Sequence, residues 1–206
     1  MGKQQILTIT KKIVTNLINL QTRIKLLPYA HENSIFTHLT LREKYTLLSL
    51  AGKYKSRNYV ELGSYIGASS CFIAAGIKKS GKEGGSLYCI DTWQNEGMSE
   101  GLRDTFDEFQ RNTTKYEEFI VALKGTSHKI AENFDKKVDF LFIDGDHSYE
   151  GVKSDVDDWF PKLNNGAIVI FHDIGWAEGV QRVVEESVRP YAKREGRLPN
   201  MYWALL

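Results

Sequence analysis

Carboxylates and imidazoles gather directly after two apolar runs of the sequence. Asp144 follows the run Val138–Ile143, and His172 and Asp173 follow the run Ala167–Phe171. Carboxylate oxygens suit Mg²⁺, and carboxylates combined with imidazole also suit Mn²⁺, Fe²⁺ or Zn²⁺. We therefore predict that Asp144, His172 and Asp173 form a metal site. In the alternative interpretation, Asp144 caps a helix or lies beside a bound nucleoside, and His172 pairs with the neighbouring strand.

A glycine turn is the second chemical signal, in the segment Tyr59-Val-Glu-Leu-Gly-Ser-Tyr-Ile-Gly-Ala-Ser-Ser70. Glycines let the backbone approach a ligand closely, and the free N–H groups at the start of the following helix favour a carboxylate or phosphate. A dinucleotide-binding turn has three glycines in the order G-x-G-x-x-G. Here only Gly63 and Gly67 are present, with Glu61 just before them. The spacing favours S-adenosylmethionine (SAM) over NAD.

The next two predicted strands end in groups that suit a nucleoside. Asp91 ends the run Ser86–Asp91, where one carboxylate can accept hydrogen bonds from both ribose hydroxyls. Thr126 and Ser127 follow the third run, Ile120–Leu123. A serine at this place is also suited to be the N-cap of the next helix, so Ser127 has a ligand-binding and a structural interpretation.

These groups require strands that end at one edge of a sheet. From Asn58 onwards apolar runs alternate with helical patterns, which predicts an α/β fold with a doubly wound, mostly parallel sheet. Ligands of such sheets bind beyond the carboxyl ends of the strands. Residues 1–56 are expected to form a helical N-terminal extension, and residues 57–206 the sheet-containing domain. The predicted strands are 59–62, 86–91, 120–123, 138–143, 167–171 and 201–206, and the predicted helices are 67–80, 99–113, 127–134, 149–163 and 177–194.

The composition indicates a globular protein without a nucleic-acid partner. Of the 206 residues 42% are hydrophobic, and the net charge of +1 lacks the basic excess of nucleic-acid-binding domains. We find no signal peptide and no run long enough to span a membrane. Cys71 and Cys89 lie in predicted elements and are expected to be reduced, which favours the cytoplasm.

The N-terminal segment from Ile6 to Leu27 predicts an amphipathic helix, because its apolar residues recur at helical spacing. We expect this helix to pack on the domain or on a second subunit. Lys11 and Lys12 leave a membrane surface as the alternative.

Together these motifs resemble class I SAM-dependent methyltransferases, close to the catechol O-methyltransferase-like group and its bacterial small-molecule relatives. The resemblance covers roughly residues 36–174 and implies a Rossmann-like sheet. It implies that Tyr65 and Ser69 hold the methionine carboxylate of SAM, that Asp91 binds the ribose and that Ser127 lies beside the adenine. The cofactor contacts it implies are Glu61, Gly63, Ser64, Tyr65, Gly67, Ser69, Asp91, Thr126, Ser127 and Asp144.

The resemblance also implies a reaction, the O-methylation of a small-molecule hydroxyl assisted by a divalent cation such as Mg²⁺. Asp144 takes the place of the Mg²⁺-binding aspartate, and His147 stands where the catechol group has its lysine base. A neutral imidazole can accept a hydroxyl proton near pH 7. His172-Asp173 replaces the Asp-Asn pair of that group. We expect the acceptor to contact the N-terminal helices and the loop 93–100.

The fold usually closes with two antiparallel strands, whereas only one run, Met201–Leu206, is evident after Asp173. An open sheet edge of this kind favours cover by a partner subunit, and hence a homodimer. Three rival functions are a non-catalytic SAM- or nucleotide-binding module, an NAD-dependent oxidoreductase and a methyltransferase of RNA or DNA, the last disfavoured by the near-neutral charge and the lack of an Asn-Pro-Pro-Tyr-type motif. Asp144, His147 and Asp173 count against the first, and the missing third glycine counts against the second.

Overall fold

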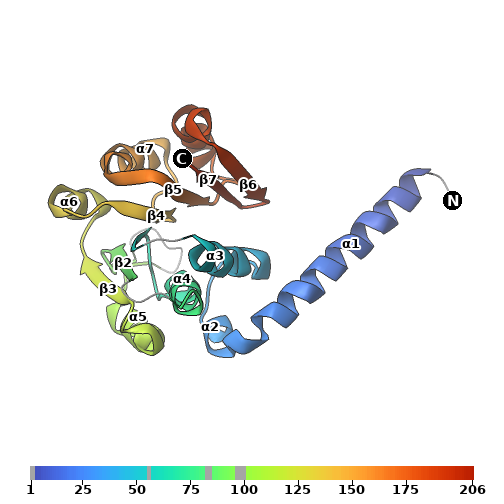
Figure 1. Cartoon of the computed structure of the whole chain (residues 1–206), viewed down its shortest axis with the longest axis horizontal. Coiled ribbons are helices and arrows are strands. Elements are labelled where there is room, and N and C mark those ends of the chain that lie inside the picture. The colour runs from blue at the N-terminus through green and yellow to red at the C-terminus, as the bar shows by residue number, and fades with distance from the viewer. Residues whose placement is uncertain (1–2, 55–56, 82–84, 96–100) are drawn as a thin grey trace.

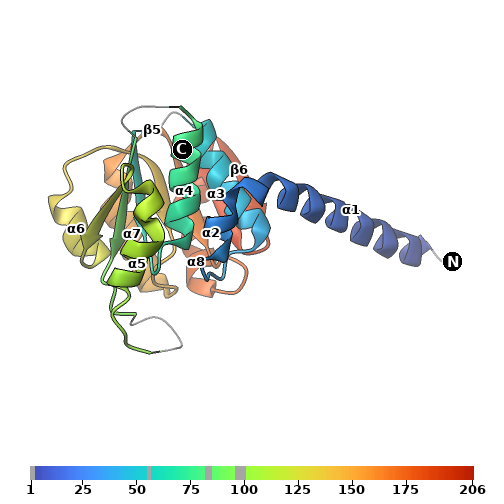
Figure 2. The same cartoon turned by 90° about the horizontal axis from the view of Figure 1, so that it is seen from below.

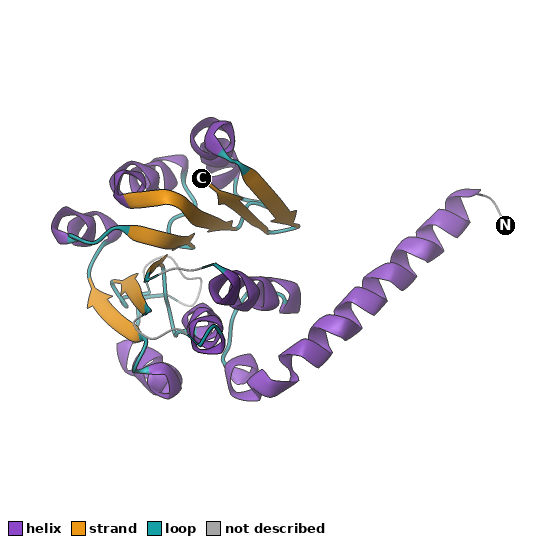
Figure 3. Cartoon of the chain, in the orientation of Figure 1, coloured by secondary structure: helices purple, strands orange, loops and turns teal. Residues whose placement is uncertain are grey.

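The centre of the protein is a seven-stranded sheet in the order β3-β2-β1-β4-β5-β7-β6 (Figures 1 and 3). The computed structural model describes residues 3–54, 57–81, 85–95 and 101–206. Strands β1 to β5 are parallel, and β7 pairs antiparallel with both β5 and β6. The strands are β1 (Asn58–Leu62), β2 (Ser86–Asp91), β3 (Ile120–Lys124), β4 (Val138–Ile143), β5 (Leu163–His172), β6 (Arg194–Leu198) and β7 (Met201–Leu205).

Helices cover both faces of the sheet, which confirms the predicted α/β, Rossmann-like fold. One apolar core lies between the sheet and α3, α4 and α5, and a second lies between the sheet and α6, α7 and α8 (Figure 1). The helices are α1 (Lys3–Leu26), α2 (Ala30–Ser34), α3 (Leu41–Lys53), α4 (Ala68–Lys79), α5 (Phe106–Thr113), α6 (Ser127–Asn133), α7 (Tyr149–Trp159) and α8 (Glu178–Val183), with short 3-10 or π turns at 27–29, 114–116, 160–162, 184–188 and 189–191.

The C-terminal edge of the sheet corrects the sequence analysis. In the predicted helix 177–194 the helical structure ends at Tyr191. The chain then forms β6, which pairs with β7. The usual hairpin is therefore present. Strand β6 escaped prediction because it is an edge strand with the sequence Arg-Glu-Gly-Arg-Leu, whose side chains are exposed or half-buried and show no apolar alternation. The argument for a dimer from a missing strand is wrong.

Helix α1 projects away from the sheet and its covering helices (Figures 1 and 2). Among its described side chains, those of Thr22 and Leu26 near its end are the buried ones, and there it packs on the domain. Packing on its own domain thus accounts for the end of this helix, and the other two expectations, a second subunit or a membrane surface, stay predictions. Within the described ranges, no helix combines the length and apolar character that crossing a bilayer requires.

Candidate functional site

The carboxyl ends of the parallel strands bring the predicted site residues to one edge of the sheet. Leu62 pairs with Ile143, and Ile143 pairs with Phe171. The residues that follow these three, Gly63, Asp144 and His172, therefore emerge side by side. A strand register set by buried apolar side chains thus determines the distance between the glycine turn and the acidic cluster.

The two glycines of the turn are required by the packing of the protein itself. Gly63 and Gly67 have φ of +82° and +88°, a region that favours glycine. A Cβ at Gly63 would lie 2.2 Å from the carbonyl oxygen of Asp144, and one at Gly67 would lie 2.6 Å from Cγ2 of Thr113. The turn is thereby pressed against the end of β4 on one side and against α5 on the other.

Asp91 organises the loops around the turn. Its Oδ2 accepts a hydrogen bond from the backbone N–H of Tyr65, and its Oδ1 accepts one from the N–H of Trp93, both at 2.7 Å. Its carbonyl oxygen accepts from the N–H of Gly125 at 2.9 Å. The ends of β1, β2 and β3 are therefore joined through one residue, and its carboxylate oxygens keep further lone pairs for a ligand.

Trp93 belongs to the core. Its ring is fully buried, with the centroids of Phe106 and Phe109 each 4.8 Å away. Its indole N–H donates to the carbonyl oxygen of Tyr65 at 2.8 Å. Trp93 thus positions the turn, and residues 96–100 of the predicted acceptor loop lie outside the described residues.

Buried polar atoms below the turn fit a polar ligand. Glu61 and Ser64 are buried, and one oxygen of Glu61 accepts a hydrogen bond from the Ser70 hydroxyl. The other oxygen, Oε1, and the Ser64 hydroxyl have no partner among the residues that the structure describes. Burial raises the pKa of Glu61. Unpaired polar atoms of this kind are costly unless something binds them, so this part of the chain suits the amino-acid end of SAM. Ser69 is buried nearby in the first turn of α4.

The start of α6 shows which residue caps this helix. Thr126, not Ser127, is the N-cap, and its hydroxyl accepts from the N–H of Lys129 at 3.4 Å. Ser127 is the first helical residue, and its hydroxyl accepts from the indole N–H of Trp159 at 2.9 Å. The cap interpretation of Ser127 is therefore wrong, and both residues still lie at the strand-end edge.

The strand ends of β4 and β5 form an acid–imidazole cluster. Nε2 of His147 lies 2.8 Å from Oδ2 of Asp173. Ligand atoms of Asp144, His147 and Asp173 all lie within 4.8 Å of one another. The hydrogen bond to Asp173 raises the pKa of His147. Burial opposes ionisation of Asp173, but the hydrogen bonds from His147 and His172 hold its pKa well below the ordinary value.

His172 supports this cluster from behind. Its ring is 3% exposed, with Nδ1 3.0 Å from Oδ1 of Asp144 and 3.3 Å from Oδ2 of Asp173. Burial would lower the pKa of His172, but Asp144, Asp173 and Glu43 together raise it to about 12. An imidazolium ion has no lone pair for a metal. The geometry thus groups His147 with the two aspartates, whereas the predicted ligand His172 contacts the same two aspartates from the buried side.

Three contacts of the cluster were not found from the sequence. Asn200 lies in the β6–β7 turn and donates to Oδ1 of Asp173 at 2.8 Å, and the indole N–H of Trp176 donates to the same oxygen at 2.8 Å. Oε2 of Glu43, in α3, lies 3.7 Å from Nε2 of His172. The pair Pro199-Asn200 is a turn signal that could have revealed the hairpin. Glu43 and Trp176 carry no local signal of this role.

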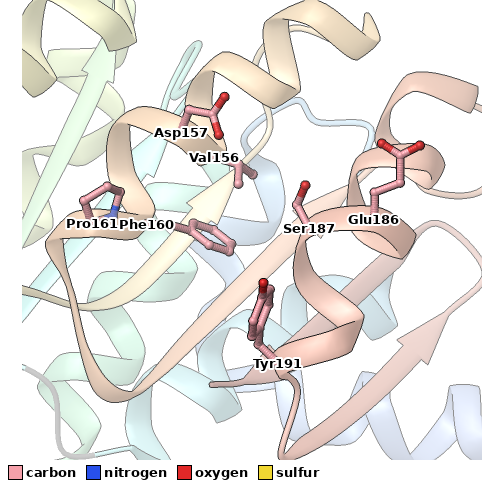
Figure 4. A pocket seen from close by; sticks show the side chains of 7 residues that line it. All are labelled: Val156, Asp157, Phe160, Pro161, Glu186, Ser187 and Tyr191. Carbon is pink, nitrogen blue, oxygen red and sulfur yellow. The ribbon is translucent and has the colours of Figure 1, made fainter.

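A surface hollow of about 300 Å³ lies elsewhere, between α7 and the helical turns at 184–191 (Figure 4). Phe160 and Pro161, which line it, precede β5, whereas the cluster follows the far end of that strand. The hollow is therefore remote from the strand ends. Its other lining residues are Val156, Asp157, Glu186, Ser187 and Tyr191.

Several known proteins resemble this chain in sequence or in fold. Over 122 residues the chain is 31% identical to the uncharacterized protein y4gI of Sinorhizobium fredii, a match that covers 58% of this chain and 13% of that protein's length. The structure resembles the O-methyltransferase NovP with a TM-score of 0.70, 16% identity and coverage of 82% of this chain and 81% of that chain. It also resembles an O-methyltransferase from Bacillus cereus in complex with S-adenosylhomocysteine (SAH), with a TM-score of 0.63, 15% identity and coverage of 90% and 91%.

At these identities the solved structures share the fold. The family comparison goes further, because a family model described as a methyltransferase domain matches residues 60–174. That range runs from β1 with its glycine turn to the residue after Asp173, and it exceeds half of the 206 residues. The expected resemblance to class I methyltransferases is confirmed, and the chain belongs to this methyltransferase-domain family.

Proposed function

We propose that this methyltransferase transfers the methyl group of SAM to the hydroxyl oxygen of a small molecule. The observation that carries the proposal is the position of the Asp173–His147 pair, one strand away from a glycine turn whose buried Glu61 and Ser64 hold unpaired polar atoms. The turn is suited to a cofactor, and the pair is suited to a hydroxyl proton. A non-catalytic module would have no use for that pair.

The cofactor half of the proposed site is the turn with its neighbours. We assign the amino-acid end of SAM to Glu61, Gly63, Ser64, Tyr65, Gly67 and Ser69, the ribose to Asp91, and the adenine side to Thr126 and Ser127, with Asp144 between the two halves. When bound, SAM supplies an electrophilic methyl group on a sulfonium. SAH in the Bacillus cereus structure supports this assignment, since that protein shares the fold.

His147 is the proposed base. Its Nε2–H donates to Asp173, which leaves Nδ1 with the lone pair that accepts a proton. The acceptor oxygen loses its proton to Nδ1 as it gains the methyl group. Asp173 orients the ring and stabilises the imidazolium that forms. The exposed indole of Trp176, whose centroid lies 4.9 Å from that of the His147 ring, offers an apolar surface for the acceptor beside the base.

A second arrangement is favoured by the convergence of ligand atoms from Asp144, His147 and Asp173. Two carboxylates and an imidazole would hold a divalent cation, which lowers the pKa of an acceptor hydroxyl. In this arrangement His147 is a ligand instead of the base. Asp173 already accepts from His147, His172, Asn200 and Trp176, so a cation would have to displace one of these donors. The base arrangement therefore fits better.

Titration calorimetry with SAM, SAH and NAD tests the cofactor. We expect binding of SAM and SAH and no binding of NAD; binding of NAD alone would overturn the proposal. Release of SAH is then measured across a panel of hydroxylated aromatic compounds and sugars, with and without chelator. Turnover that persists in excess chelator supports the base arrangement, and complete loss that Mg²⁺ restores supports the cation.

The remaining proposals concern the setting of the protein. Cys71 and Cys89 are buried and unpaired, which is consistent with a reducing compartment, and we propose the cytoplasm. We also propose that the acting form is a homodimer, because α1 leaves apolar side chains exposed.

A further inference from the structure

Most of α1 is a projecting helix with an uncovered apolar surface. From Leu7 to Gln21 every described side chain is exposed or half-buried, and Figure 2 shows the helix extending beyond the domain. Five large apolar side chains, which we call the α1 seam, are 53% to 71% exposed: Ile13, Leu17, Leu20, Ile24 and Leu27. Helix α1 together with the turn after it therefore presents a continuous apolar stripe to solvent.

The seam lies on the side of α1 that faces away from the domain. Thr22 and Leu26, which are buried at the root of the helix, lie about half a turn around the axis from Leu20 and Ile24, at about 100° per residue. Contact with the domain therefore uses the other side of α1. The exposed stripe does not belong to the core of its own chain.

The spacing of the seam is that of a coiled coil. Its members follow one another at intervals of four, three, four and three residues, the alternation of the a and d positions of a heptad. Ile6 lies one heptad before Ile13 in the sequence, with Thr10 at the a position between them. Exposed Val14 widens the apolar stripe on one side.

Side chains at a and d positions pack against a helix that carries the same repeat, so the seam of a second copy of the chain suits it as the occupant. Helix α1 contains five basic residues and no acidic residue, so two copies can meet only where these charges lie off the seam. Lys11, Lys12 and Lys25 lie away from the seam. The four positions that flank it most closely are Val14, Asn16, Gln21 and Arg23, and of these only Arg23 is charged. Two seams can therefore meet without opposed lysines.

We propose that two copies of the protein pair through their α1 seams, in a coiled-coil contact related by a two-fold axis. A surface that is complementary to itself closes in this way and leaves no free seam. The seam supplies a contact surface for the proposed homodimer. This inference does not rest on the methyl-transfer chemistry, because the seam contains none of the strand-end residues.

Sedimentation velocity of the full chain tests the proposal. The seam variant is Leu17→Glu/Leu20→Glu, and the matched control is Thr15→Glu/Asn19→Glu, which adds the same charge to the opposite side of α1. We expect a dimer for the wild type and the control at tens of micromolar protein. The seam variant should be a monomer, with a dimer affinity more than about tenfold weaker. Unchanged melting temperature and SAM binding would show that the domain is intact.

A monomeric wild type, or a seam variant that remains dimeric, would overturn the proposal. Flotation with vesicles of phosphatidylcholine and phosphatidylglycerol gives the third outcome. Vesicle binding by a monomeric wild type that the seam variant loses would assign the stripe to a lipid surface and reject the dimer. Failure of the SAM-binding experiment would leave this result unaffected.

Discussion

Glu43 in α3 and His172 at the end of β5 form a buried ion pair, with Oε2 3.7 Å from Nε2 and both side chains at most 3% exposed. The same carboxylate oxygen accepts hydrogen bonds from the N–H and hydroxyl of Thr40, at 2.7 and 2.8 Å, in the capping box of α3. Burial opposes ionisation of Glu43, but His172 and Thr40 lower its pKa. One side chain thus fixes the start of α3 and compensates the cation behind Asp144 and Asp173.

Replacing Glu43 by Gln should separate these two roles. Glutamine can still serve in a capping box, so the start of α3 should persist. The buried cation, however, loses a charged partner, and we expect a loss of about 2 kcal/mol in the free energy of unfolding. Urea denaturation measures this loss in the free energy of unfolding. The control Glu118→Gln changes an exposed residue 3.5 Å from Lys78 and should alter stability by less than about 0.5 kcal/mol. Equal effects for both variants would contradict the role of the ion pair.

The pKa of His147 should depend on Asp173. Because the hydrogen bond from His147 to Asp173 stabilises the protonated ring, we expect a pKa above the ordinary 6.5 in an NMR titration of the ring. Asp173→Asn removes the negative charge and should return the pKa towards 6.5. Because methyl transfer requires the unprotonated ring, the rise of activity with pH should occur at a lower pH in the variant than in the wild type. Asn200→Ala, which removes another donor to Asp173, tests whether the charge or the position matters. An unchanged pKa in Asp173→Asn would exclude the proposed pairing.

The sequence predicted the parts of the fold that rest on apolar periodicity. Strands β2 and β4 have their predicted bounds, because their apolar runs are nearly continuous and every side chain in them is buried or half-buried. Strand β6 was missed, since its pairing with β7 depends on the edge of the sheet and not on its own residues. The cluster residues Asp144, His172 and Asp173 were predicted because they directly follow strands whose apolar runs are evident in the sequence.

The partners of the cluster could not be predicted, because tertiary packing places them. Glu43 precedes β1 and Asn200 follows β5 in the chain, and both reach His172 or Asp173 only when α3 and the hairpin pack against β5. The same packing gives His172 contacts that the sequence did not predict. Its two nitrogens face carboxylates that lie 28, 1 and 129 residues away in the chain, at Asp144, Asp173 and Glu43.

Binding of Mn²⁺, followed by electron paramagnetic resonance, should distinguish the two arrangements of the cluster. If a cation is bound, Asp144→Asn and His147→Ala should each weaken binding by at least about tenfold, since each removes one of three ligands. The matched control is Asp146→Asn in the same loop, because Asp146 accepts from the N–H of Ser148 at 2.7 Å and lies outside the ligand group. Absence of saturable Mn²⁺ binding in the wild type would leave His147 as the base.

Asp155 should make the stability of the protein depend on pH. This residue of α7 is 7% exposed, and burial raises its pKa from 3.8 to about 6. Between these values the folded protein keeps a proton that the unfolded chain has lost, so the free energy of unfolding falls as the pH rises from about 4 to about 6 and then stays lower. The total effect is at most about 3 kcal/mol, because one pKa unit corresponds to about 1.4 kcal/mol.

Asp155→Asn cannot ionise and should remove this dependence. We expect the variant to exceed the wild type in stability above pH 6, and the difference to shrink towards pH 4, in urea denaturation curves recorded across this range. The control Asp157→Asn changes a carboxylate of the same helix that is 61% exposed and pairs with Lys153, so it should leave the pH dependence of the wild type intact. Parallel curves for Asp155→Asn and the wild type would show that Asp155 is ionised in the folded protein, and that a partner compensates its charge.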